Sequence, residues 1–178
     1  MNKLFIIITI LVFISCNTDN NKADLMKGNK SENEKTIKNE IIPKVTGIGG
    51  IFFFSEDAEK TKKWYSENLG LETNQWGASF EFRNANRPKE INYLQWSPFK
   101  KGSEYFSPSK KDFMINYRVQ NIEGLVNKLK SNGVKILDTI EAFDYGKFVH
   151  IMDEDGNKIE LWEPIDSVFT DMGGKTCK

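Results

Sequence analysis

The chain has 178 residues, and its 25 Lys and Arg residues balance its 25 Asp and Glu residues. A neutral chain lacks the positive field that attracts phosphates, so we expect no nucleic-acid partner. Its length and its hydrophobic content of 39% suit one domain with a modest core. The sequence contains one His, which excludes a metal site built from several histidines of one chain. Its two Cys lie near opposite ends and form no disulfide framework or metal motif.

Residues 1–16 have the pattern of a secretory signal peptide. Lys3 supplies a positive start, and residues 4–14 form an apolar run that is too short to span a bilayer. The run ends in Phe-Ile-Ser-Cys, which resembles the lipobox of bacterial lipoproteins, where the cysteine is lipidated and becomes the new N-terminus. The pattern predicts a protein of the bacterial cell envelope that a lipid on Cys16 anchors to a membrane. An ordinary signal peptide cleaved elsewhere is the alternative.

Residues 17–44 are rich in Asn, Lys and Glu and contain few apolar side chains. Such a segment cannot bury enough surface to offset the entropy lost on ordering it. We therefore expect a disordered tether that holds the folded part of the chain away from the membrane.

Two similar modules follow the tether. In the first, residues 55–57 can cap a helix that Gly70 ends, and in the second, Asn121 caps a helix that Gly133 ends. A turn of sequence DEDGN joins the last two strands. We expect strands at residues 45–54, 76–83, 91–96, 113–119, 134–137, 148–152 and 158–162, and helices at residues 58–68 and from residue 122 onward.

The two modules also agree in their spacing. Asp57 lies seven positions after Gly50, and Asn121 lies seven positions after Met114. Each module ends in a Trp-x-Pro sequence. Modules of this kind pair because each curved sheet leaves one face uncovered. The connection at residues 97–111 permits pairing within one chain or between two chains, so a homodimer stays open as an expectation.

The two modules together resemble the vicinal oxygen chelate superfamily, which includes glyoxalase I, extradiol dioxygenases, fosfomycin-resistance enzymes and bleomycin-binding proteins. The resemblance rests on GIGGIFFF…WYSENLGLE, FMINYRV…LKSNGV and YGKFVHIMDEDGNKIELWEP. It implies an α+β fold in which two tandem βαβββ modules form a curled sheet around a cleft. The domain would cover residues 45–165 and leave residues 166–178 as a tail.

The resemblance also implies where a divalent metal ion would bind. The ligand positions of metal-using members correspond to Gly50, Met114 and Glu160, with a fourth at Leu94 or Gln95. One carboxylate and one amide oxygen are too few, because a catalytic divalent ion usually takes three protein ligands. His150 lies outside the usual ligand positions. The sequence therefore predicts a cleft with no cofactor or with an atypical divalent metal at Glu160.

Alternation along the strands predicts which side chains face the cleft. Asn116 and Arg118 share the face of Met114, and Glu160 reaches the cleft from the last strand. Arg118 would bind an anionic group, Arg118 or Asn116 would polarise a substrate oxygen, and Glu160 would act as a base on a carbon acid. A structural ion pair between Arg118 and Glu160 is the alternative. The candidate ligand-binding residues are Phe52, Phe54, Trp76, Trp96, Met114, Tyr145 and Trp162.

Three functions fit this arrangement. The aromatic walls and the incomplete metal site favour a module that binds a small organic ligand with an apolar body and a polar or anionic end. A metal-assisted lyase or isomerase of the glyoxalase kind, acting on a small carbonyl compound with Glu160 as base or ligand, is the alternative. A scaffold at the membrane, with the cleft filled by side chains, is the third.

Overall fold

The computed structural model describes residues 41–178. The expected signal peptide, Cys16 and nearly all of the expected tether lie outside the described residues. Within residues 41–178, no helix is both long enough and apolar enough to span a membrane.

The first module contains one helix and four strands. These elements are β1 (Lys44–Ser55), α1 (Ala58–Leu69), β2 (Thr73–Asn74), β3 (Gly77–Asn84) and β4 (Arg87–Lys100). Helix α1 begins where the Asp57 carboxylate accepts a hydrogen bond from the amide of Lys60 at 3.0 Å, and it ends at Gly70, whose φ is +70°. Strand β4 is longer than expected and uses the first residues of the expected connection.

The second module follows the short 3-10 helix η1 (Glu104–Phe106) and repeats this order with one short strand, β7, added. Its elements are β5 (Phe113–Gln120), α2 (Ile122–Ser131), β6 (Lys135–Ile136), β7 (Glu141–Phe143), β8 (Gly146–Met152) and β9 (Lys158–Pro164). The side chain of Asn121 caps α2 by accepting from the amide of Gly124 at 3.0 Å. The expected turn between β8 and β9 forms, with Gly156 at a φ of +77°.

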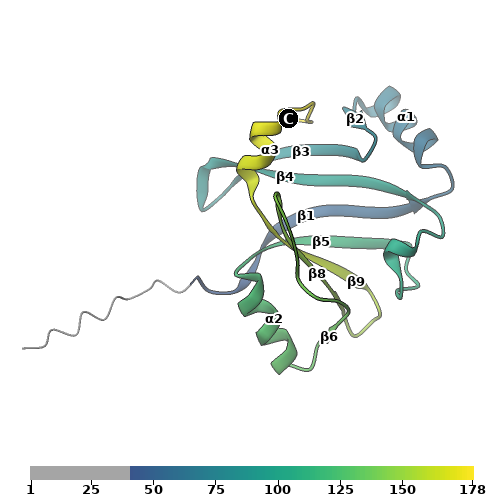
Figure 1. Cartoon of the computed structure of the whole chain (residues 1–178). Coiled ribbons are helices and arrows are strands. Elements are labelled where there is room, and N and C mark those ends of the chain that lie inside the picture. The colour runs from purple at the N-terminus through teal and green to yellow at the C-terminus, as the bar shows by residue number, and fades with distance from the viewer. Residues whose placement is uncertain (1–40) are drawn as a thin grey trace, which may run out of the picture. The chain divides into compact units, whose positions relative to one another are not determined.

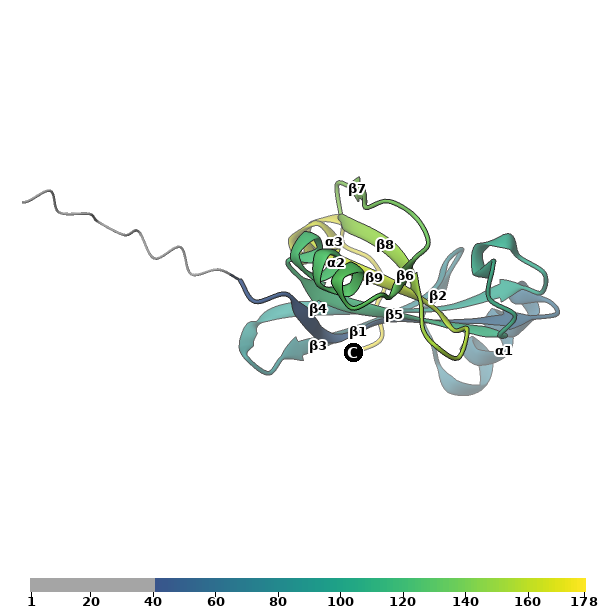
Figure 2. The same ribbon diagram turned by 90° about the horizontal axis from the view of Figure 1, so that it is seen from below.

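One sheet of nine strands joins the two modules in the order β2-β3-β4-β1-β5-β9-β8-β6, with β7 pairing to β8 (Figure 1). Within each module the first strand runs parallel to the last, β1 with β4 and β5 with β9. The modules meet where β1 pairs antiparallel with β5. Seen edge-on, β7 and β8 rise out of the layer of β1, β4 and β5, so the sheet is curled (Figure 2). The expected α+β fold of two βαβββ modules is confirmed.

The core consists of two hydrophobic clusters, one within the second module and one between the modules. The larger cluster lies where α2 packs on its own module's strands and includes Ile122, Leu125, Val149 and Leu161. Ile122, Leu125, Val126 and Leu129 recur at helical spacing, so they share the face of α2 that packs into this cluster. The smaller cluster consists of Phe52, Phe106 and Met114, with Phe54 and Phe99 packed against it.

The residues expected as a C-terminal tail instead contain a helix, α3 (Asp166–Met172), which lies beside β4 (Figure 1). Asp166 forms an ion pair with Arg118 and accepts a hydrogen bond from Asn92 at 3.0 Å. Further along, the amide of Cys177 donates to the carbonyl of Ser79 at 2.8 Å, which attaches the chain end to β3. This C-terminal segment, residues 165–178, therefore runs from the second module back to the first.

Asp166 should contribute strongly to stability, because the Arg118 side chain is only 3% exposed. Asp166→Ala leaves that guanidinium buried without its carboxylate, and we expect it to lower the free energy of unfolding by about 3 kcal/mol. Chemical denaturation measures this change. The matched control is Asp171→Ala, which removes an exposed carboxylate of the same helix. Equal losses of stability in the two variants would contradict a stabilising role for the ion pair between Asp166 and Arg118.

Candidate functional site

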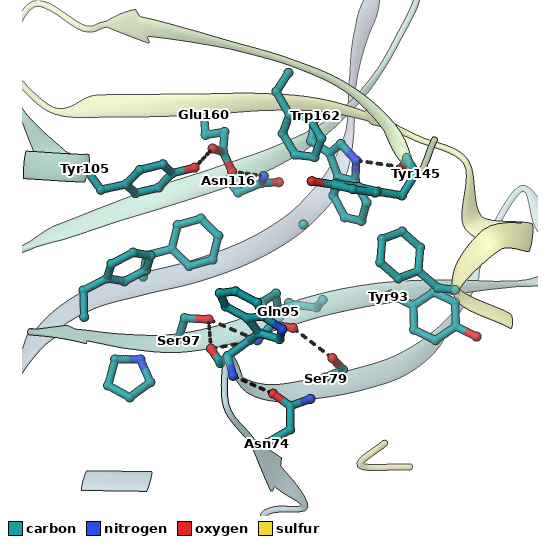
Figure 3. A pocket seen from close by; sticks show the side chains of 18 of the residues that line it. Asn74, Ser79, Tyr93, Gln95, Ser97, Tyr105, Asn116, Tyr145, Glu160 and Trp162 are labelled. Carbon is teal, nitrogen blue, oxygen red and sulfur yellow. Dashed lines mark hydrogen bonds between the residues drawn. The ribbon is translucent and has the colours of Figure 1, made fainter. Parts of the chain in front are cut away.

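A cavity of about 760 Å³ lies between the two modules. Strands β3 and β4 supply one side of its wall, and β5, β8 and β9 supply the other (Figure 3). Two residues of α3, Phe169 and Met172, also line it. The C-terminal segment thus completes a wall that the two modules alone would leave open.

Strand register brings the polar residues of the wall into one row. Gly50 pairs with Gln95 on β4 and with Asn116 on β5, and Asn116 pairs in turn with Glu160 on β9. The row therefore crosses four central strands. It places Asn116 and Glu160 next to each other on the cavity wall (Figure 3).

The Glu160 carboxylate stands at the β9 end of this row and is only 3% exposed. Its Oε1 accepts a hydrogen bond from Asn116 Nδ2 at 2.6 Å, and its Oε2 accepts one from the Tyr105 hydroxyl. His150 Nε2 lies 2.9 Å from the same Oε2. These three partners compensate the loss of water around a buried carboxylate.

His150 connects Glu160 to the more exposed Asp138. Its Nδ1 lies 2.6 Å from Asp138 Oδ2, and its backbone amide donates to Asp138 Oδ1 at 2.8 Å. Both ring nitrogens therefore face carboxylates, an arrangement that suits the protonated imidazole, in which both nitrogens are donors. Burial lowers the pKa of His150, but the hydrogen bonds and charge of Glu160, together with Asp138, outweigh it and raise this pKa above its ordinary value.

Tyr105 has a hydroxyl that stays protonated as a donor to Glu160. Burial, and then the charge of Glu160 and the hydrogen bond to it, raise the pKa of Tyr105 well above its ordinary value. The Lys158 ammonium donates to the backbone carbonyl of Tyr105 at 2.7 Å, and burial lowers the pKa of Lys158. The polar end of the cavity is therefore an ordered network around one carboxylate.

Aromatic rings make up much of the remaining wall. Phe99 stacks on Tyr105 with centroids 5.2 Å apart, and Phe148 stacks on Trp162 with centroids 5.8 Å apart. The site residues expected from the sequence that do line the cavity are Phe52, Trp76, Asn116, Tyr145, Glu160 and Trp162.

Arg118 does not line the cavity. Its guanidinium pairs with Asp166, donates to the carbonyl of Tyr93 at 3.0 Å and lies 5.1 Å from the ring centroid of Trp162. It therefore forms neither the expected anion site nor the alternative ion pair with Glu160. Alternation places Arg118 on the expected face of β5, but α3 and Trp162 cover it there.

Three expected ligand-binding residues also lie elsewhere. Met114 is fully buried and packs against Phe106, and Phe54 stacks on Phe106 with centroids 4.3 Å apart. Trp96 packs against Tyr65 of α1 with centroids 4.6 Å apart. Trp96 lies outside the cavity because successive side chains of a strand point to opposite faces of the sheet. Its neighbours in β4, Gln95 and Ser97, are on the face that lines the cavity.

Sequence reasoning missed Tyr105, Asp138 and the role of His150. Tyr105 lies in the connection between the modules, where the sequence has no strand or helix periodicity that would indicate which way its side chain points. His150 had a usable signal, because counting back from the turn pairs it directly with Glu160 across the hairpin. Asp138 lies in a loop, and only the fold brings it to His150.

The side chains at the expected ligand positions do not fit a divalent metal ion. A Cβ built on Gly50 would lie 2.7 Å from the ring of Phe52, so that ring fills the place of a ligand. Met114 is buried in the smaller core cluster. Gln95 accepts a hydrogen bond from Ser79 and donates one to Ser97. Among the described residues, no three His, Cys, Asp or Glu side chains gather as a metal site.

Comparisons with known proteins give three kinds of result. No family model matches the chain. A sequence relative is the uncharacterized protein YetH of Bacillus subtilis (strain 168), 28% identical over 131 residues, which cover 65% of this chain and 97% of YetH.

Solved structures with a similar fold include methylmalonyl-CoA epimerase of Streptomyces coelicolor. A variant of that epimerase in complex with 2-nitronate-propionyl-CoA has a TM-score of 0.52 and 12% identity, over 68% of this chain and 99% of the epimerase. A methylmalonyl-CoA epimerase in complex with methylmalonyl-CoA and NH4+ has a TM-score of 0.51 and 14% identity, over 68% of this chain and 96% of that one. A glyoxalase/bleomycin resistance protein/dioxygenase superfamily member of Vibrio splendidus 12B01 has a TM-score of 0.43 and 14% identity, over 65% of this chain and 97% of that one. At these identities the likeness concerns the fold.

The single histidine of the chain offers a direct test of this network. NMR titration should give His150 a pKa above the ordinary value of 6.5, and Glu160→Gln should lower that pKa because it removes the carboxylate that raises it most. A raised pKa in the folded state also stabilises the protein below the unfolded-state value, and this stabilisation is lost as the pH rises through the folded-state value. Glu154→Gln, an exposed change in the neighbouring turn, is the control. An unshifted pKa in the unaltered protein would contradict the network.

Proposed function

We propose that this chain, which has the two-module fold of the vicinal oxygen chelate superfamily, binds a small organic ligand in the cavity between its modules. The observation that carries the proposal is the composition of the cavity wall, where aromatic rings surround one buried polar network. An apolar ligand body would pack against the rings, and its polar end would lie at Glu160 and Asn116. Pockets of this kind bind organic ligands by combining apolar area with a few oriented polar groups.

The size of the cavity supports a ligand rather than a scaffold filled by side chains. A volume of about 760 Å³ falls within the range of drug-sized binding sites. The wall is also well held, because Glu160, Asn116 and Tyr105 fix one another by hydrogen bonds. A wall that is already ordered loses little entropy when a ligand binds.

An enzyme that moves a proton without a metal ion is the second candidate. It is favoured by the continuous contact from Glu160 through His150 to Asp138, which is 43% exposed at its side chain. Glu160 would take a proton from a carbon next to a carbonyl group, and Asn116 would hold Glu160 in place. His150, protonated and paired with Asp138, would stabilise the ionised form of Glu160 that acts as the base. The metal-assisted form of this reaction is disfavoured by the side chains at the expected ligand positions.

We also propose that the protein is held at the bacterial cell envelope by a lipid on Cys16. The signal-like residues 1–16 and their Phe-Ile-Ser-Cys end support this location. Expression in a bacterium with radiolabelled palmitate should label the protein, and Cys16→Ala should abolish the label. Cys177→Ala is the control, because it removes the other thiol of the chain. Equal labelling of the two variants would contradict the anchor.

A screen of small molecules by thermal shift tests the binding function. Ligands of the cavity should raise the melting temperature, and Trp162→Ala should reduce this rise because it removes a ring of the wall. Trp64→Ala is the matched control, because Trp64 lies on α1, is 53% exposed and does not line the cavity. Binding in the cavity would be contradicted by compounds that raise the melting temperature equally in the unaltered protein, in Trp162→Ala and in Trp64→Ala.

A further inference from the structure

We propose that the cavity selects a ligand with a positively charged head group, an ammonium or a similar organic cation, seated at Glu160. This inference rests on the proposed binding function and specifies its ligand class. The sequence predicts a ligand with a polar or anionic end, and the anionic form of that end loses its support because Arg118 does not line the cavity.

The charges on the cavity wall carry the argument. Of the described residues that line the cavity, only Glu160 and Lys100 are formally charged. Glu160 is 3% exposed, whereas Lys100 is an exposed side chain at the end of β4. The one buried charged side chain that lines the cavity is therefore a carboxylate. Charges withdrawn from water interact more strongly than exposed ones, because the surrounding dielectric constant is lower.

The buried cations near the cavity do not themselves line it, and each already has a hydrogen-bond or ion-pair partner. Arg118 is bound to Asp166, and the ammonium of Lys158 is bound to the backbone carbonyl of Tyr105. His150 lies between Glu160 and Asp138, so a carboxylate on each side balances a protonated imidazole. Lys158, His150 and Asp138 do not line the cavity, and Tyr105 is held as a neutral donor. An anionic head group at Glu160 would therefore meet a carboxylate and no available cation.

The neighbouring rings favour the same ligand class. Phe52 and Phe99 meet Tyr105 near the carboxylate, and Phe148 and Trp162 form a stacked pair on the same wall. The faces of aromatic rings attract cations, most strongly where water is excluded. In addition, Asn116 Oδ1 is buried without a hydrogen-bond partner among the described residues. The polar end thus holds one acceptor without a donor, which an N–H-bearing cation would match.

Three soluble probes of similar size and different charge test the inference. They are 2-phenylethylammonium, 2-phenylethanol and phenylacetate, and their dissociation constants can be measured by NMR chemical-shift titration of the full chain at neutral pH. We expect the cation to bind about tenfold more tightly than the alcohol, and phenylacetate to bind most weakly. This comparison needs no variant, so it stands even where a substitution disturbs folding.

Glu160→Gln then assigns the preference to the carboxylate. In this variant the cation should lose its advantage over the alcohol, whereas Glu154→Gln, an equal change of charge in an exposed turn, should keep that advantage. Equal binding of the three probes, or a cation preference that survives Glu160→Gln, would overturn the cation proposal and leave the binding function standing. Binding of none of the probes at millimolar concentration would contradict both.

Discussion

The buried carboxylate of Glu160 is the constraint on which the rest of the site depends. A carboxylate at 3% exposure is stable only if donors replace its lost water, and here Asn116, Tyr105 and His150 do so. These donors come from β5, from the connection between modules and from β8. Keeping one charge buried therefore links three separate segments of the chain, and it orders the polar end of the cavity.

The way the modules pair turns this network into a site. Because β1 and β5 meet antiparallel, the last strands of the two modules lie on opposite sides of the central pair, with a cavity between them. The C-terminal segment then closes part of the wall, since Asp166 pairs with Arg118 and Phe169 contacts the ring of Trp162. This ion pair removes a guanidinium from the cavity and leaves the wall with a negative polar end.

The sequence predicts the architecture well, because alternation, helix caps and turns are local signals. It places both modules, the caps at Asp57 and Asn121, and Glu160 on the cavity face. It does not predict which side chains cover one another. Arg118 lies on the expected face of β5, yet contacts from a helix 48 residues away in sequence determine its partner. Tyr105 reaches Glu160 across 55 residues from a segment without periodicity. Such contacts depend on the packed fold.

The central claim is that donors from side chains, and not a metal ion, satisfy Glu160. Metal analysis of the purified protein after dialysis against Zn²⁺, Mn²⁺ and Fe²⁺ tests this claim most directly. The account predicts a content well below one ion per chain, unchanged by Glu160→Gln. One tightly held ion per chain that Glu160→Gln releases would contradict it.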